Sequence, residues 1–77
     1  MPLVTVAVHE GQFDDAQKAR MISLVTDAVV EAEGLGEGGR ASTLVQIEEI
    51  PPGNFGVGGR QVRLADFLAL AQSRAGA

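Results

Sequence analysis

Pro2 is the residue whose type and position in this sequence most directly allow chemistry. Cytosolic processing ordinarily removes an initiator methionine that stands before a small residue such as proline. Loss of Met1 would expose the secondary amine of Pro2. The pyrrolidine ring restricts the direction of its lone pair, and an ordinary α-amino group has a pKa of about 7.7–8.0. An apolar pocket or a nearby cation lowers such a pKa. Pro2 is therefore a candidate general base at neutral pH, whereas retention of Met1 would leave its nitrogen as a non-basic amide.

Other combinations of reactive residues are weaker candidates for a catalytic or metal-binding site than Pro2. His9 is the single histidine and cysteine is absent, so neither a Cys/His zinc site nor a disulfide can form. At a strand end we expect the His9 side chain to be solvated rather than part of a catalytic triad. Glu48 and Glu49 are adjacent on a predicted strand and point to opposite faces, which excludes a paired-carboxylate site. We expect no metal and no other cofactor.

Two strands are predicted to position Pro2. Residues 3–9 are rich in valine, which predicts a strand buried on both faces. Pro2 would lie at its head, where a missing amide donor is tolerated. In residues 43–50 the apolar side chains alternate with polar ones, which predicts a second strand with one face toward a core.

A helix is predicted between these strands. Asp14 followed by Gln17 is an approximate capping box, and apolar residues recur at helical spacing, which predicts a helix at about 15–33. Residues 34–42 contain several glycines and are predicted to form a loop. The strand, crossover helix and strand therefore predict a right-handed βαβ unit with two parallel strands.

The remaining residues predict a small C-terminal structure. The glycines of residues 54–59 predict a bend, followed by an extended segment at 61–64, and together they indicate a compact hairpin. The GVGG sequence within it lacks the Lys-Ser/Thr of a phosphate-binding loop. A short amphipathic helix follows, with Asp66 as its possible N-cap, and residues 73–77 are expected to fray.

The length and charge of the chain restrict its partners. A chain of 77 residues is expected to form a single domain, residues 1–77. Ten acidic residues against six basic ones, with no basic run beside the aromatic residues, argue against nucleic acid. No apolar stretch approaches the roughly 18 residues of a membrane span, and a signal sequence is not evident. We therefore expect a cytoplasmic protein with no membrane partner.

A two-stranded sheet of this kind is incomplete. Its strand edges are open, and one helix covers only one face. Chains of this size rarely build a core large enough for high stability, and self-association is the remaining remedy in a sequence without cysteine. We expect an α+β fold, namely a βαβ subunit with two parallel strands, a C-terminal hairpin and a short helix, assembled as a homo-oligomer.

The start and the second half of the sequence carry a resemblance to a known family. The opening MPLVTV, the EG at residues 10–11 and IEEIPPGNFGVGG at residues 47–59 resemble the 4-oxalocrotonate tautomerase family of amino-terminal-proline enzymes. The likeness covers about residues 2–59. It implies a cofactor-independent isomerase of a small molecule, built as a homohexamer, a trimer of dimers, with sites shared between neighbouring subunits.

The resemblance also assigns roles to two residues. It implies that Pro2 is the catalytic base and that Phe55 lines the pocket and keeps the amine neutral. The physical logic agrees, because an aromatic wall that excludes water disfavours the ammonium form.

Two positions depart from the family pattern. Gln12 and Leu44 stand where the family has arginines, one after the EG and one in the second strand. Neither an amide nor an alkyl chain can replace a bidentate guanidinium. Arg40 and Arg60 are candidates to supply a cation from other directions. The residues expected to contact the substrate are Phe55, Arg40, Arg60, Leu44 and Gln12.

These residues predict keto–enol tautomerisation of a small unsaturated 2-oxo or 2-hydroxy acid, with Pro2 carrying the proton. Two alternatives stay open. The same proline could serve a hydratase, dehalogenase or decarboxylase, which needs an added acid such as Glu10, Glu48 or Asp66. The chain could instead be a non-catalytic small oligomeric binding module that has lost its arginines.

Overall fold

The computed structural model describes residues 2–34 and 36–75. These residues form two compact units, one of residues 2–7 and 13–48 and the other of residues 8–12 and 49–75. The elements in chain order are β1 (Leu3–His9), α1 (Asp15–Glu33), α2 (Gly36–Ala41), β2 (Leu44–Ile50), β3 (Gly56–Val57), β4 (Arg60–Gln61) and α3 (Leu64–Ala75).

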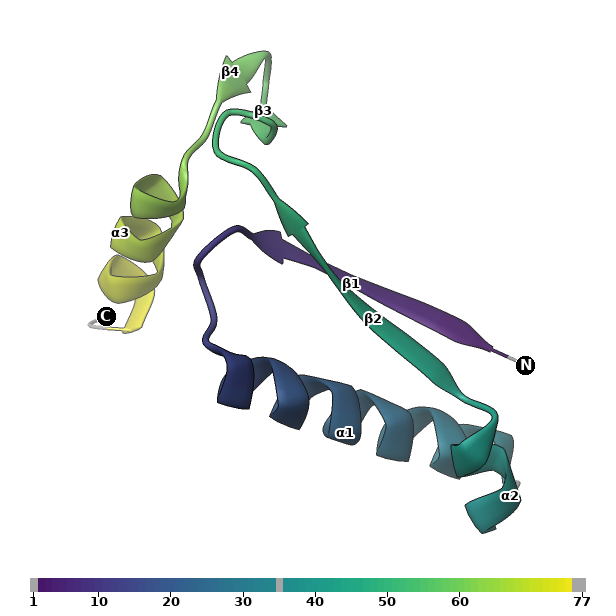
Figure 1. Cartoon of the computed structure of the whole chain (residues 1–77). Coiled ribbons are helices and arrows are strands. Elements are labelled where there is room, and N and C mark those ends of the chain that lie inside the picture. Colours follow the sequence, from purple (N-terminus) through teal and green to yellow (C-terminus); the bar gives the residue numbers. More distant parts are fainter. Residues whose placement is uncertain (1, 35, 76–77) are drawn as a thin grey trace. The chain divides into compact units, whose positions relative to one another are not determined.

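Strands β1 and β2 pair in parallel, as the sequence predicts. The amide of Leu44 donates to the Pro2 carbonyl at the start of both strands, at 2.9 Å. The amide of Glu10 donates to the Ile50 carbonyl where both strands end, also at 2.9 Å. Figure 1 shows the two strands side by side with the same direction, and α1 connects them. The predicted βαβ unit is thus confirmed.

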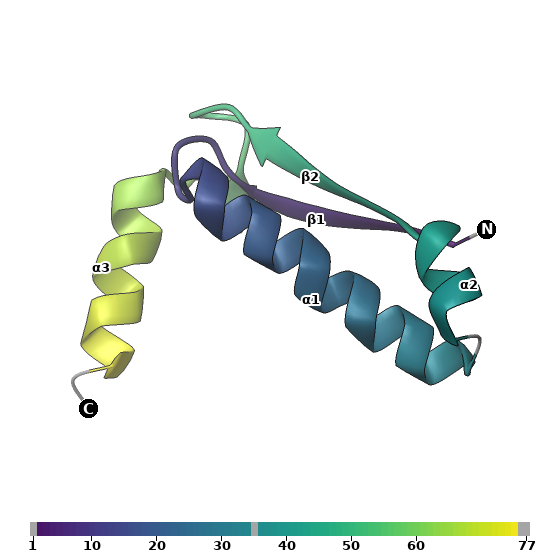
Figure 2. The ribbon, with the colours of Figure 1, turned by 60° about the horizontal axis from the view of Figure 1, so that its bottom comes forward.

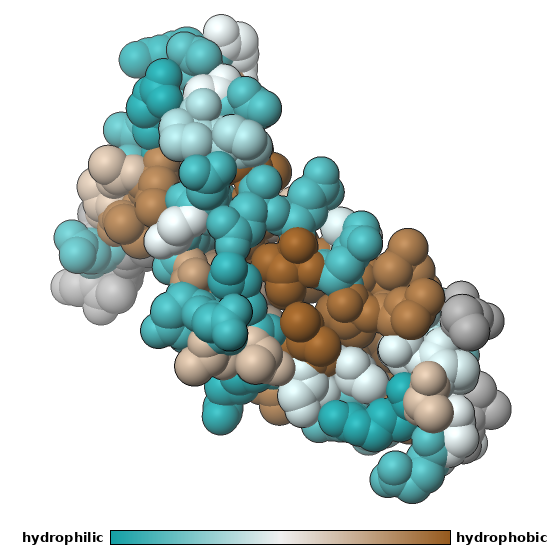
Figure 3. Space-filling view, viewed as in Figure 1, coloured by the Kyte–Doolittle hydropathy of each residue, from teal (hydrophilic) through white to brown (hydrophobic). Residues whose placement is uncertain are grey.

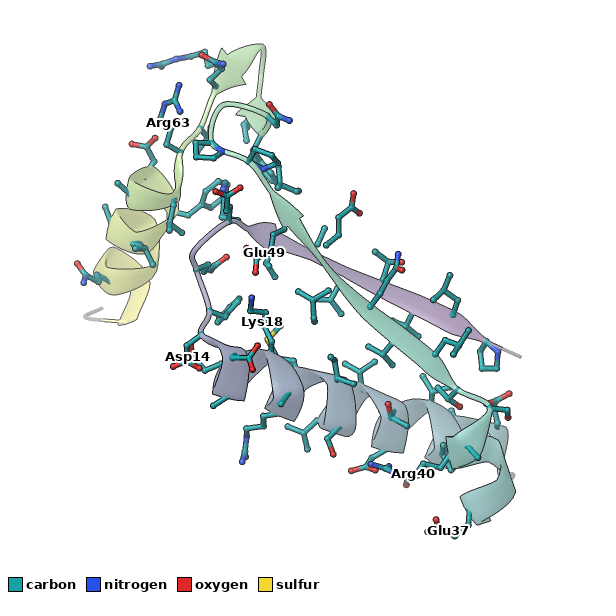
Figure 4. The ribbon with its side chains drawn as sticks, viewed as in Figure 1. Asp14, Lys18, Glu37, Arg40, Glu49 and Arg63 are labelled. Atoms are coloured by element: carbon teal, nitrogen blue, oxygen red, sulfur yellow. The ribbon has the colours of Figure 1, made fainter. Side chains whose placement is uncertain are left out.

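Helix α1 begins and ends at the residues that the sequence predicts. The Asp14 carboxylate accepts from the Gln17 amide at 2.8 Å, and the Gln17 side chain accepts from the Asp14 amide at 2.9 Å. Asp14 lies at the start of the helix in Figure 4. Gly34 ends the helix with a φ of 70°, a left-handed conformation that glycine adopts without steric cost. Local signals therefore determine both ends of α1.

Replacing Asp14 by alanine is expected to lower the free energy of unfolding by about 1 kcal/mol, because the Gln17 amide loses its acceptor. Urea unfolding followed by circular dichroism measures the change. Asp15→Ala is the matched control, since Asp15 is an acidic residue of the first turn that is not the N-cap. Equal losses in both variants would show that charge near the helix start, and not the capping box, accounts for the effect.

Residues 36–41 form a short helix, α2, where the sequence predicts a loop. The prediction was wrong because glycine disfavours helix only weakly compared with tertiary contacts. Arg40 forms an ion pair with Asp27 of α1 and donates to the Ser23 hydroxyl at 3.3 Å. The Thr43 hydroxyl donates to the Gly39 carbonyl at 2.7 Å and closes the C-terminal end of the helix. These contacts hold α2 against α1.

The sheet has one half-buried face and one exposed face. Along β1 and β2 the side chains alternate between the two states, so the prediction of burial on both faces of β1 was wrong for a single chain. Helix α1 runs along the strands in both ribbon views (Figure 1, Figure 2) and covers one face only. The exposed side chains are Leu3, Thr5 and Ala7 of β1 and Leu44, Gln46 and Glu48 of β2.

The exposed face of the sheet carries three apolar side chains, Leu3, Ala7 and Leu44, beside three polar ones. Figure 3 shows apolar surface over β1 and β2, where the Leu3 and Leu44 side chains are 58% and 47% exposed. Gln46 donates across the strands to the Thr5 hydroxyl at 3.0 Å. Among the described residues no hydrophobic side chain is fully buried. A single chain therefore leaves several large apolar side chains, Leu3 and Leu44 among them, largely in contact with water.

The second unit contains the predicted hairpin. Strands β3 and β4 pair antiparallel, with Val57 opposite Arg60. Gly58 and Gly59 join them with φ values of 60° and 84°, which is the backbone of a type I′ turn and explains the two glycines. The Val62 amide continues the pairing by donating to the Phe55 carbonyl at 2.9 Å.

Helix α3 differs from the prediction at both ends. It begins at Leu64, so Asp66 lies in its first turn rather than at the N-cap. The Asp66 carboxylate nevertheless caps the helix by accepting from the Arg63 amide at 2.9 Å. Helical structure continues to Ala75, through part of the segment expected to fray, and residues 76–77 lie outside the described part. In the described part, none of the helices is both long and apolar enough to cross a membrane.

Candidate active site

Pro2 lies at the head of β1 and is half-buried. Its carbonyl accepts from the Leu44 amide at 2.9 Å, which holds the residue in line with the strand pair. The proline ring fixes φ, and the hydrogen bond fixes the peptide that follows. The direction of the Pro2 nitrogen is therefore restricted from both sides, as a positioned base requires.

Leu44 is the partner of Pro2 at this end of the sheet, and its side chain belongs to the exposed face. Arg40 lies nearby in the chain, in α2, but its guanidinium pairs with Asp27 and Ser23 of α1. Figure 4 shows Arg40 against that helix. A substrate carboxylate would have to compete with Asp27 for this cation.

Arg60 lies on β4 and is exposed. It helps to line an open hollow of about 310 Å³ in the second unit, together with Val57, Gln61, Val62 and Asp66. The Asp66 carboxylate is committed to the Arg63 amide, as described above. The hollow therefore combines the Arg60 guanidinium and the Asp66 carboxylate with two valines, so an anion bound to Arg60 there would lie near a second negative charge.

Gln12 does not extend from the turn after β1. Its side-chain oxygen accepts from the His9 amide at 3.3 Å, while its own amide donates to the His9 carbonyl at 3.1 Å. The glutamine thus closes the turn that carries Gly11, whose φ of 82° requires a residue without a side chain. The position that holds an arginine in the resembled family here stabilises its own loop.

Phe55 is half-buried and belongs to a cluster of three rings. Its ring centroid lies 4.8 Å from that of His9 and 5.1 Å from that of Phe67, and His9 and Phe67 are 4.7 Å apart. The two phenylalanine rings meet at 88°, the edge-to-face arrangement that their quadrupoles favour. We call His9, Phe55 and Phe67 the aromatic cluster.

His9 is buried, with 7% of its surface exposed, so the expectation of a solvated side chain was wrong. The reason is that Phe55 and Phe67 arrive from distant parts of the chain and cover it. Its Nε2 atom has no hydrogen-bond partner among the described residues. The sequence indicates the burial of His9 only in part. Phe55 and Phe67 are two of its three phenylalanines, but their contact with His9 could not be deduced from spacing.

The described residues contain no group of three or more histidine, cysteine or acidic side chains placed to hold a metal ion. What the fold does present is a parallel strand pair joined by a helix, with a proline at the head of the first strand and a glycine hairpin after an aromatic residue. This combination defines a small α+β protein built on a βαβ unit with a C-terminal hairpin.

The chain belongs to the tautomerase family. The model of this family, described as tautomerase enzyme, matches residues 2–65. A probable tautomerase from Staphylococcus aureus (strain MRSA252), SAR1376, is 41% identical over 66 residues, covering 86% of this chain and 98% of that protein. A 2-hydroxymuconate tautomerase from Bacillus subtilis (strain 168) is 39% identical over 67 residues, covering 87% and 98%.

Solved structures agree with the fold. The crystal structure of YwhB, named a homologue of 4-oxalocrotonate tautomerase, superposes with a TM-score of 0.68 at 37% identity and covers 84% of this chain and 97% of its own. The resemblance noted in the sequence is therefore confirmed. These comparisons support a tautomerase, an isomerase, as the class of enzyme.

Proposed function

We propose that this protein interconverts the keto and enol forms of a small unsaturated 2-oxo or 2-hydroxy acid, with Pro2 as the general base. The observation that carries the proposal is Pro2 itself, a half-buried proline held at the head of β1 in a chain of the tautomerase family. The relative named 2-hydroxymuconate tautomerase supports an acid of this class as substrate.

The reaction needs no group beyond a base and hydrogen-bond donors. Neutral Pro2 takes the proton from the enol hydroxyl and redelivers it to a carbon of the conjugated system, so the amine is regenerated in each turnover. Negative charge develops on the carbonyl oxygen between the two transfers, and donors that bind it more strongly than the neutral substrate accelerate the step. Within one chain Phe55 contacts His9, at the opposite end of β1 from Pro2, so the proposal takes the apolar wall that keeps the amine unprotonated from the Phe55 of a neighbouring subunit.

The proposal assigns the binding of the acid to residues other than the two missing arginines. Arg60 is the better candidate cation, because it is exposed beside the hollow, whereas Arg40 pairs with Asp27. Leu44 and Gln12 occupy the matching positions without a charge, which favours a substrate with one carboxylate over a dicarboxylate. Activity is therefore expected to be higher on phenylenolpyruvate than on 2-hydroxymuconate.

We further propose that the site is completed between subunits of a homohexamer, a trimer of dimers. Two exposed leucines on one face of β1 and β2 support association, since a single chain leaves Leu3 and Leu44 largely in water. The predicted cytoplasmic location stays a prediction.

The test compares turnover with the state of the amino terminus. Intact mass shows whether the isolated protein lacks Met1, and ultraviolet absorbance follows the enol form of phenylenolpyruvate. We expect the mature protein to catalyse ketonisation and a form extended by one residue before Pro2 to be inactive, because its nitrogen is an amide. Turnover by both forms would show that the Pro2 nitrogen is not the general base. A mature protein that binds the acid without converting it would instead indicate the non-catalytic binding module.

A further inference from the structure

Helix α3 lies almost wholly outside the part of the chain that matches the family. The match ends at residue 65, whereas α3 spans Leu64–Ala75. One side chain of this additional segment, Phe67, nevertheless contacts Phe55, the residue that the proposed function places in the wall of the active site. A segment beyond the family match therefore touches a residue of the proposed site.

We propose that Phe67 is a positioning residue for Phe55, so that α3 is part of the construction of the active site in this protein. The inference rests on the proposed function, because it assumes that Phe55 shields the Pro2 amine of a neighbouring subunit. It goes further by assigning a role to a helix that the family match does not include.

The geometry of the aromatic cluster carries this proposal. Phe67 meets Phe55 edge-to-face at 88° with ring centroids 5.1 Å apart, and His9 contacts both rings at 4.8 and 4.7 Å. The Phe55 ring thus has neighbours on two sides. Removing Phe67 would leave His9 as the only remaining ring of the cluster in contact with it.

Each ring is mounted on backbone that is itself held. His9 ends β1, where the next amide, of Glu10, donates to Ile50 of β2. The Phe55 carbonyl accepts from Val62 in continuation of the hairpin. Phe67 lies in the first turn of α3, which the Asp66 carboxylate caps. Hydrogen bonds hold the backbone at or next to each of the three ring-bearing residues. The His9 and Phe67 rings therefore stay in place and limit the rotation of the Phe55 ring.

The aromatic cluster includes one polar ring, that of His9, which is buried between Phe55 and Phe67. Its Nε2 atom is buried without a partner among the described residues, and such an atom is unfavourable compared with a carbon of the same shape. The imidazole and Phe67 together surround Phe55 more completely than either ring alone. The cluster is consistent with a wall whose position matters.

The functional consequence concerns the pKa of the Pro2 amine. A fixed Phe55 ring excludes water and disfavours the ammonium form, which lowers this pKa. When the ring is free to turn away, water enters and the pKa rises. Because the free amine is the active form, the acidic limb of the kcat/KM profile moves to higher pH, while kcat/KM on the alkaline side of that limb changes less.

The experiment measures pH profiles of kcat/KM for phenylenolpyruvate in Phe67→Ala, Phe55→Ala and the double variant. We expect the acidic limb to move up by about one pH unit in each single variant, and the double variant to match Phe55→Ala, because Phe67 acts through Phe55. Leu68→Ala is the matched control, since the neighbouring Leu68 is 47% exposed and outside the cluster; its profile should equal that of the unaltered protein. Phe67→Tyr retains the ring and should restore the profile.

Some results would overturn the inference while leaving the proposed function intact. One is a Phe67→Ala profile that coincides with that of the unaltered protein while Phe55→Ala shifts. Another is a double variant whose acidic limb lies at a higher pH than that of Phe55→Ala alone, because the effect of Phe67→Ala would then not act through Phe55. If Phe67→Ala does not fold, Phe67→Leu fills the space without a ring and is expected to shift in the same direction. Loss of the proposed function itself would be seen separately, as full activity of a Pro2→Ala variant.

Discussion

A Pro2→Ala variant that has lost Met1 is expected to show a kcat/KM for phenylenolpyruvate about 10²–10⁴-fold below that of the unaltered protein, the usual contribution of a positioned general base. The variant retains an α-amine, so the loss reports on the ring and its fixed lone pair rather than on the presence of nitrogen. A primary amine at a chain end rotates freely and loses the alignment on which proton transfer depends.

The control is Pro52→Ala, which removes an exposed proline from the turn after β2 and should leave kcat/KM unchanged. Mass spectrometry must show that the Pro2→Ala protein begins at the new alanine, and circular dichroism that it folds. A processed, folded Pro2→Ala protein with unaltered turnover would rule Pro2 out as the base. Product analysis by NMR on the unaltered protein would separate tautomerisation from hydration or decarboxylation.

Leu3→Glu is expected to dissociate the proposed homo-oligomer. Leu3 is 58% exposed in the single chain and lies on the bare face of a sheet that α1 covers on one side only. Burial of a leucine side chain contributes about 1.5–3 kcal/mol per subunit, and a carboxylate in its place has to be desolvated without a partner. Sedimentation velocity should show a species smaller than that of the unaltered protein, with a lower unfolding midpoint, since association stabilises the folded chain.

The matched control is Leu68→Glu, which places the same charge on another exposed leucine, at 47% exposure. Leu68 lies outside the residues that match the family, and we expect this variant to keep the mass of the unaltered protein. A Leu3→Glu protein with unchanged mass would show that the face of β1 and β2 is not the interface. Dissociation by both variants would point to a general effect of added charge.

Much of the fold could be predicted because its signals are local. The capping pair Asp14 and Gln17 and the left-handed Gly34 lie within or next to the helix that they delimit. Gly58 and Gly59 determine the hairpin turn for the same reason, since a type I′ turn needs positive φ at two adjacent residues. Alternation of side chains in β2 likewise predicted which residues share a face.

The errors lie where distant residues meet. Helix α2 depends on the pair between Arg40 and Asp27, and the glycines around Arg40 predict a loop when considered alone. Burial of His9 depends on Phe55 and Phe67, which follow it far along the chain. No local pattern contains information on such contacts, because they are formed only when separate elements pack.

By itself the sequence determined the βαβ elements, the family resemblance and the two residues at the centre of the proposal, Pro2 and Phe55. Only the tertiary structure decided that Arg40 is engaged by Asp27, that Gln12 closes its own turn, and that α3 supplies a ring against Phe55. The physical reason is that residue type and spacing control backbone conformation over a few residues, whereas the neighbours of a side chain depend on how the whole chain packs.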